Sequence, residues 1–494
     1  MSEQSLDLQP QNSLAPAKKN IAGVCIALQI AILLSALDQT VLNIAIPKIA
    51  AALNAVDKSA WIITAYLLFS TIATPLAGKL ADIYGVKNVL LAAILLFAAA
   101  STLCGAAGSI PVLFGLDAID QLILARALQG LAGGAMLGLC FVSIGEVFPV
   151  AERGKYQGFL AAAFIVAALV GPVLGGFIAD KSSWRLVFYM NIPLSAIAAL
   201  FLYLSFPLTT RKLARAIIDY KGIVFFVLTI VPVILGAAEI GRLGHFSPSA
   251  AVELGGALLA FYLFIRCEEK AIEPLIPLTI FKDRLIAISL TTVFITGIGL
   301  FGSMLLLATI LQQLLLRSAT ATGVTLTPLM IVVAGASIAG GLILSKSGRY
   351  KLLILSGLTL LALGTALIGV QVQAVQAGLN QVSAENSLSA LLAAAALGGV
   401  GLGLLLPVHT IIIQKIVPSE IMGVATSMTQ FFRSLGGTIG TGLMSALMLC
   451  LLKVGNLQTA TSQVLYIYAS FIVLTLLLNL FLPEVPLRDG KSGK

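Results

Sequence analysis

A carboxylate and a guanidinium lie inside two long apolar runs of the sequence. Asp38 falls in the run 20–45, and Arg126 falls in the run 118–142. A charged side chain in a membrane span costs ~2.5–3.5 kcal/mol on insertion scales and is a functional candidate by default. Because burial disfavours the charged form of a carboxylic acid, Asp38 could gain and lose a proton near neutral pH. The two residues therefore predict reversible proton binding. The alternative is a static ion pair that joins two helices.

The positions of Asp38 and Arg126 predict that they lie at one depth in the membrane. If the N-terminus is cytoplasmic, the first run crosses outward and the fourth crosses inward. Asp38 then precedes the outer end of its run by about seven residues, and Arg126 follows the outer start of its run by about as many, which places both ~10 Å below the outer surface. We therefore expect Arg126 to tune the proton affinity of Asp38 and to sense its protonation.

Other polar side chains lie in or near apolar runs, and we expect some of them to line a substrate cavity. Arg433 has an alternative structural role, as a partner of backbone carbonyls or of Gln430. His409 has the alternative role of a histidine that only packs between helices. The candidates for the substrate cavity are Gln129, Gln312, Gln313, His409, Gln430 and Arg433.

Composition sets the kind of fold that must position these residues. Of 494 residues, 59% are apolar and 10% are charged, against ~25% charged in a soluble domain. The mean hydropathy is +1.04. Such a chain predicts an all-α integral membrane protein, because a spanning helix needs ~20 apolar residues. Fourteen runs of that length fall at about 20–45, 58–78, 88–108, 118–142, 156–179, 186–207, 221–241, 249–267, 285–311, 322–345, 351–372, 388–413, 421–450 and 462–482.

The distribution of basic residues predicts the orientation of the chain. Of the 30 Lys and Arg, 21 fall on the side of the N-terminus and 7 on the other side, while Arg126 and Arg433 lie inside runs. Cytoplasmic loops carry this excess, so both termini are expected in the cytoplasm. The net charge of +9 then needs no nucleic acid. Five scattered cysteines and two histidines predict no metal site and no cofactor.

The chain also repeats itself at a nearly constant offset. Gly154 and Gly423 are 269 residues apart, and Gly78 and Gly341 are 263 apart. Two homologous halves are the architecture of secondary transporters, with the substrate site between them. The expected parts are a cytoplasmic N-terminal tail (1–19), an N-terminal six-helix half (20–207), inserted helices 7 and 8 with linkers (208–284), a C-terminal six-helix half (285–482) and a cytoplasmic C-terminal tail (483–494).

Several motifs resemble, in order, those of the major facilitator superfamily and of its fourteen-helix drug:proton antiporter branch. They are Leu37-Asp38-x-Thr40-Val41-Leu42-Asn43-x-Ala45-x-Pro47, the loop Gly78-Lys79-Leu80-Ala81-Asp82-Ile83-Tyr84-Gly85-Val86-Lys87, Leu122-x3-Arg126-x2-Gln129-Gly130-x3-Gly134-Ala135, Gly171-Pro172-x2-Gly175-Gly176, Trp184-Arg185-x2-Phe188-x2-Asn191-x-Pro193 and Glu273-Pro274-Leu275-Ile276. The resemblance implies two six-helix halves with two inserted helices, fourteen spans in all.

The resemblance also implies roles for particular residues. Asp38 and Arg126 match the positions associated with proton coupling. The signature loop usually carries two arginines where this chain has Ile83 and Val86, so its gating is expected to be weaker or differently wired. The residues expected to control conformational change are Gly78, Asp82, Gly85, Lys87, Arg153, Gly171, Pro172 and Gly175. Arg153 has the alternative of being a plain solvated charge, and Gly171 and Pro172 the alternative of ordinary helix packing.

The function expected from these observations is proton-driven export, not enzymatic catalysis. The expected partners are protons, the lipid bilayer and a lipophilic substrate of cationic character, moved by alternating access through a monomer in a bacterial inner membrane. The proton gradient is the expected energy source, because Gly490-Lys491-Ser492 lacks the rest of a phosphate-binding loop. Two alternatives remain: a dedicated exporter of a lipid, siderophore or other amphiphile, and a membrane receptor or scaffold that transports nothing.

Overall fold

The computed structural model describes residues 21–55, 58–109, 116–181, 183–207, 218–317, 319–376 and 384–483. Within these ranges the chain forms helices and no strand, which confirms the predicted all-helical class. Lipid offers the backbone no hydrogen-bond partners, so a spanning segment satisfies its own N–H and C=O groups by forming a helix. Both expected tails lie outside the described residues, apart from position 483.

The N-terminal half contains six of the predicted runs, and its last run is divided. Its helices are α1 (Ile21–Ala52), α2 (Ser59–Tyr84), α3 (Val86–Ala106), α4 (Ala118–Val147), α5 (Val150–Lys181), α6 (Leu186–Tyr189) and α7 (Asn191–Ser205). Pro193 lies in the first turn of α7 and has no N–H to donate to the preceding turn. This explains why the helix is interrupted at Met190 between α6 and α7.

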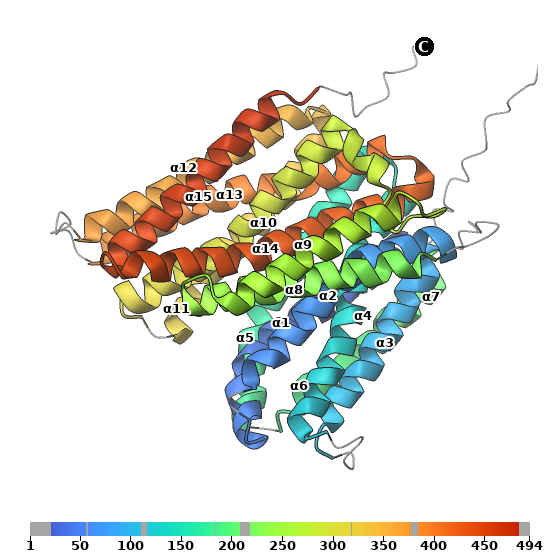
Figure 1. Cartoon of the computed structure of the whole chain (residues 1–494), viewed down its shortest axis with the longest axis horizontal. Coiled ribbons are helices and arrows are strands. Elements are labelled where there is room, and N and C mark those ends of the chain that lie inside the picture. The colour runs from blue at the N-terminus through green and yellow to red at the C-terminus, as the bar shows by residue number, and fades with distance from the viewer. Residues whose placement is uncertain are drawn as a thin grey trace, which may run out of the picture.

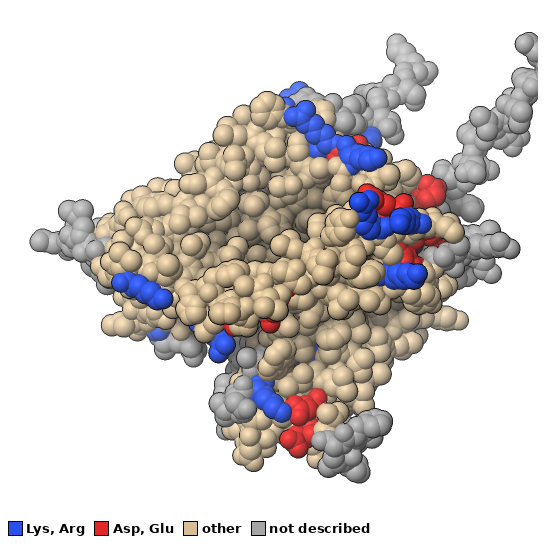
Figure 2. Space-filling view, in the orientation of Figure 1, with Lys and Arg blue, Asp and Glu red and all other residues tan. Residues whose placement is uncertain are grey.

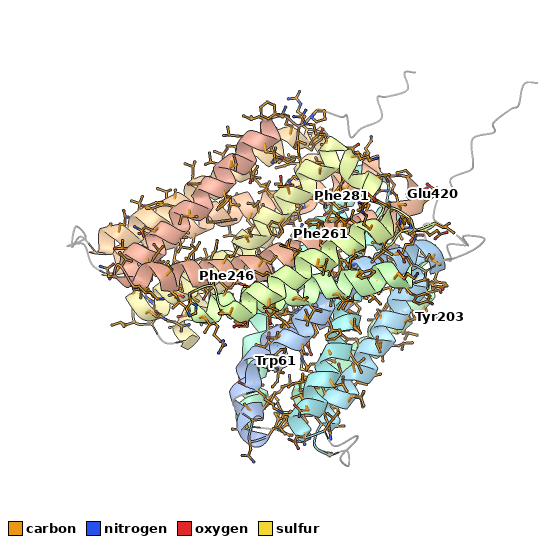
Figure 3. All side chains as sticks on the ribbon, viewed as in Figure 1. Trp61, Tyr203, Phe246, Phe261, Phe281 and Glu420 are labelled. Carbon is orange, nitrogen blue, oxygen red and sulfur yellow. The ribbon has the colours of Figure 1, made fainter. Side chains whose placement is uncertain are left out.

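Two helices, α8 (Tyr220–Leu243) and α9 (Pro248–Glu268), follow the N-terminal half and pack against each other. The Asp219 carboxylate accepts from the Gly222 N–H at the start of α8, and the Ser247 hydroxyl accepts from the Ala250 N–H at the start of α9. The pair lies beside α2 and α14 (Figure 1). Phe246 and Phe261 (Figure 3) are 62% and 47% exposed, as expected of a surface in lipid.

The C-terminal half contains the remaining long helices. They are α10 (Arg284–Thr309), continued by the π-helical turn η2 (Ile310–Leu314), then α11 (Ala319–Ser347), α12 (Tyr350–Gln376), α13 (Ala384–Ile416), α14 (Met422–Leu452) and α15 (Leu457–Leu480). Two short 3-10 helices, η1 (Leu278–Lys282) and η3 (Ser419–Ile421), precede α10 and α14.

Thirteen helices in the described part of the chain are long and apolar enough to cross a membrane. They do not include α5, which has 32 residues. Each of the fourteen predicted runs overlaps a helix, and the protein is a multi-pass membrane protein by its helices and composition. The exact number of spans and the cytoplasmic placement of the termini stay predictions.

The two halves meet at one end of the molecule and separate at the other. We call the end where α1 begins and α15 ends the converging end, and the opposite end the diverging end (Figure 1). Contacts between the halves join α5 to α11 and α2 to α14. Lys and Arg side chains gather at the converging end in Figure 2, as the predicted cytoplasmic side requires.

Candidate functional site

Asp38 lies at the centre of a buried polar cluster in the N-terminal half. Its side chain has 0% exposure. One carboxylate oxygen accepts a hydrogen bond from Arg126 Nη1 at 2.6 Å. The other accepts from Gln129 Nε2 at 2.8 Å and from Asn191 Nδ2 at 2.9 Å. The carboxylate therefore has three donors from α4 and α7, and one of them carries the opposite charge.

Arg126 is held in position by α2 as well as by Asp38. Its Nε donates to the Ile62 carbonyl at 3.2 Å, and its guanidinium lies over the Tyr66 ring at 4.3 Å. The Tyr66 hydroxyl in turn bonds to Ser35 of α1 at 3.0 Å. A guanidinium that is stacked on an aromatic ring and bonded on several sides has little freedom to leave the carboxylate.

Small residues let α4 approach α2 closely enough to build this cluster. A Cβ added at Gly130 would collide with the Tyr66 backbone, and one added at Gly134 would collide with the Ser70 backbone. Glycine at these positions is therefore required by the close contact of two backbones. The spacing of Gly130 and Gly134 in the fourth run is thus explained by packing against α2.

A first contact between the halves lies at the converging end. The two oxygens of Asp82 on α2 accept from the backbone N–H groups of Gly423 and Val424, at 2.7 and 2.9 Å. These N–H groups belong to the first turn of α14, where the helix dipole also favours a negative charge. Gly78 packs one turn away, where an added Cβ would collide with Gly423 and Ser427.

A second contact joins α5 to the C-terminal half at the same end. Arg153 donates to the carbonyls of Gly145 and Phe148 in its own half and to the Gln414 carbonyl of α13, at 2.6, 3.0 and 3.1 Å. Beside it, Gly154 and Gly341 are so close that a Cβ on either would collide with the carbonyl of the other.

A second polar cluster lies in the C-terminal half, on α13 and α14. Arg433 Nη1 donates to Gln430 Oε1 at 3.1 Å, and Nη2 donates to the Leu406 carbonyl at 3.1 Å. Among the described residues, Arg433 Nε, Gln430 Nε2 and both ring nitrogens of His409 are buried without a hydrogen-bond partner. We call Arg433, Gln430 and His409 the Arg433 cluster.

The sequence comparison agrees with this architecture. The family model described as Major Facilitator Superfamily matches residues 28–441, which is most of the chain. The chain belongs to the major facilitator superfamily.

Relatives of this major facilitator protein carry transporter names. The chain is 34% identical over 432 residues to the multidrug transporter protein MdtP of Bacillus subtilis, covering 87% of this chain and 75% of that one. It is 32% identical over 430 residues to multidrug resistance protein 3 of the same organism, covering 84% and 77%. The proton:xylose symporter XylE has the same fold with a TM-score of 0.64 at 16% identity, covering 94% and 96%. The two Bacillus subtilis relatives support a transporter role, and the likeness to XylE supports the fold.

The structure places the expected gating residues of this major facilitator protein in different settings. Gly85 has φ 84° between α2 and α3, a conformation that favours glycine. Lys87 donates to the carbonyls of Tyr203 and Phe206 at 2.8 and 2.9 Å, so its contacts stay within the N-terminal half. Figure 3 marks Tyr203 on α7 near the converging end.

The expected hinge on α5 packs against α1. A Cβ at Gly171 would collide with Thr40, and Gly175 is buried one turn further along. The side chain of Pro172 lies outside the described residues. The hinge role of these three positions stays a prediction.

The expected cavity residues divide into three groups. Gln129 belongs to the Asp38 cluster by its contacts, with 0% exposure. Gln312 and Gln313 are exposed in the π-helical turn η2 at the diverging end. His409, Gln430 and Arg433 form the Arg433 cluster, and a cavity role remains a prediction for all six residues.

Sequence reasoning assigned no role to three members of the Asp38 cluster. Asn191 bonds Asp38 directly, Ser101 accepts from Gln129 at 2.8 Å, and Tyr66 stacks on Arg126. Each is a polar residue in a predicted apolar run, and this is the sequence feature that could have identified it as a member of the cluster. Position along a run gives depth only, whereas a contact also requires the right helix face.

Proposed function

We propose that this protein is a proton-coupled exporter of lipophilic drugs that works by alternating access in a bacterial cytoplasmic membrane. The observation that carries the proposal is the Asp38 carboxylate, which is fully buried and paired with Arg126 at 2.6 Å. A buried ion pair is poor evidence for stability alone, because well-packed apolar residues often do as well. Its cost is better explained by a task that requires charge in the interior.

Protonation of Asp38 is the proposed coupling step. A neutral carboxyl no longer balances the charge of Arg126, and removing one partner of a buried pair costs about 3–5 kcal/mol. A proton driven by ~100 mV supplies about 2.3 kcal/mol per charge moved. The gradient alone does not cover the cost, so the protonated cluster has to rearrange. The cluster contains side chains from α1, α3, α4 and α7, and Arg126 also donates to the Ile62 carbonyl of α2. The rearrangement therefore involves five helices of one half.

The relative arrangement of the halves supports an outward-facing state. The contacts of Asp82 and Arg153 join the halves at the converging end, which is the predicted cytoplasmic side from the distribution of Lys and Arg. A substrate released from such a state leaves toward the outside, and the proton that reaches Asp38 enters from there.

Lipophilic character of the substrate has more support than the predicted cationic charge. Asp38 is the acid available to a cation in the N-terminal cluster, and it is already paired with Arg126. In the C-terminal half, the range 285–482 contains two acids. Glu385 is the second residue of α13, and Glu420 lies in η3.

The test uses purified protein in liposomes that contain a pH-sensitive dye, with ethidium and chloramphenicol as a charged and a neutral lipophilic probe. We expect the addition of a probe to trigger proton movement in the wild type and none in Asp38→Asn. Asp120→Asn is the matched control, because Asp120 pairs with Lys58 at 2.8 Å on the surface, where both side chains are partly exposed. Proton movement that survives in Asp38→Asn would refute the assigned coupling residue.

A further inference from the structure

The Arg433 cluster contains a buried positive charge that its own half cannot neutralise. Glu385 precedes His409 on α13 by 24 residues, or ~36 Å of helix. Glu420 precedes Arg433 by 13 residues, or ~20 Å of chain if all of it were helical. Among the described residues no carboxylate pairs with Arg433. Burial of an unpaired guanidinium is expensive, so the charge needs an explanation.

The unpartnered atoms of the cluster are mainly hydrogen-bond donors. Arg433 Nε and Gln430 Nε2 can only donate, and a neutral His409 adds one N–H. The Gln430 oxygen is already used by Arg433. The cluster thus offers three donors and a positive charge, and a group that satisfies them must accept hydrogen bonds and carry negative charge.

The cluster follows the part of α14 that contacts the N-terminal half. Ser427 of α14 lies against Gly78 of α2 and Gly138 of α4. Each step of three residues turns about 60° around α14, so Arg433 lies about 120° around the helix from Ser427, and its guanidinium reaches the Leu406 carbonyl of α13. Arg433 lies ~9 Å beyond Ser427 along the helix axis. Arg433 also keeps 9% of its surface exposed, whereas His409 keeps 0%, so Arg433 is the more accessible of the two.

We propose that the Arg433 cluster binds a negatively charged, hydrogen-bond-accepting group, such as a carboxylate, on the transported molecule. This inference rests on the proposed export function and specifies the substrate as a lipophilic molecule with an acidic head group. Arg433 supplies the charge and a donor, Gln430 a second donor, and His409 a third. The assignment favours the amphiphile alternative over a simple lipophilic cation.

The test compares two fluorescent probes that share one aromatic group and differ in charge. Dansylglycine has a carboxylate and dansylcadaverine has an ammonium group. Both are titrated against the purified full-length protein in detergent, without a pH gradient. We expect the wild type to bind dansylglycine more tightly, and Arg433→Gln to weaken that binding by about tenfold or more, as expected when a charge-assisted hydrogen bond is lost. Binding of dansylcadaverine should change by less than about twofold, because its ammonium gains nothing from the guanidinium.

Two further variants separate binding from folding. Arg433→Lys keeps the charge but loses the planar fork, so its affinity for dansylglycine should fall between the other two proteins. Arg349→Gln removes an exposed arginine at the converging end and should match the wild type. Equal weakening of both probes in Arg433→Gln, or a wild-type preference for dansylcadaverine, would overturn the proposal.

The outcomes for the two proposals are distinguishable. The titrations require no proton movement, so Arg433-dependent binding of dansylglycine without proton coupling in liposomes would refute the proposed function alone. Proton-coupled export by a protein whose probe binding ignores Arg433 would refute the carboxylate site alone.

Discussion

The two halves of this transporter fold carry buried arginines in opposite electrostatic situations. Arg126 in the N-terminal half has a carboxylate at 2.6 Å. Arg433 in the C-terminal half has a carbonyl and an amide oxygen as partners, and no carboxylate pairs with it among the described residues. We therefore expect a proton to unbalance the ion pair in one half and a ligand to balance the charge in the other. A repeated scaffold has acquired different chemistry in each copy.

The contacts between the halves show the same asymmetry. Gly78 packs on Gly423, and Gly341 packs on Gly154. Gly78 corresponds to Gly341 in the repeat, and Gly423 corresponds to Gly154. The two contacts are therefore equivalent to each other in the repeat. Asp82 accompanies the first contact with two hydrogen bonds to α14, whereas Ser345 occupies the equivalent position at the second, with its hydroxyl unpartnered among the described residues.

The largest effect on stability is expected from Arg126→Gln, which removes the ion pair that distinguishes the N-terminal half from the C-terminal half. The substitution leaves the Asp38 charge buried without its cation, which should destabilise the protein by about 3–5 kcal/mol. Adding Asp38→Asn removes the uncompensated charge and should recover most of that loss. Thermal unfolding of the purified proteins in detergent checks both steps. Equal stability of the single and double variants would show that the two side chains are not coupled.

The sequence predicted much of the fold because lipid imposes simple rules. Each apolar run overlaps a helix, since the backbone in lipid must satisfy itself. The offset between Gly78 and Gly341 and between Gly154 and Gly423 predicted two halves, and the structure adds that members of different pairs touch. The break at Met190 between α6 and α7 was not predicted, because hydropathy indicates one continuous run there.

The candidate site was only partly predictable. The common depth of Asp38 and Arg126 predicted a contact that the structure contains. Asn191 and Tyr66 were not predicted, because their place around the helix axis depends on how α7 and α2 pack against α1 and α4. The unbalanced charge of Arg433 became evident only when its neighbours on α13 were known.

An intermediate effect is expected from Asp82→Ala compared with Ser345→Ala. The first loses two hydrogen bonds from a charged group, each worth about 1.5–3 kcal/mol. The converging end should therefore open more often in Asp82→Ala and hardly change in Ser345→Ala. The spin-label distance between α2 and α14 at this end, measured in detergent, reports the opening. Similar distance distributions in the two variants would show that the two contacts are equivalent and would remove the asymmetry between them.

The smallest effect, and the one of opposite sign, is expected from Arg433→Gln in the absence of ligand. Removing a buried charge that has no carboxylate partner relieves a desolvation cost, which offsets the loss of the hydrogen bonds to Gln430 and to the Leu406 carbonyl. We expect the unfolding temperature of Arg433→Gln to equal or exceed that of the wild type, whereas Arg126→Gln lowers it. Dansylglycine should raise the unfolding temperature of the wild type and leave that of Arg433→Gln unchanged, since a ligand stabilises only the protein that binds it. A large loss of stability in Arg433→Gln would mean that Arg433 is balanced by structural partners as firmly as Arg126 is by Asp38.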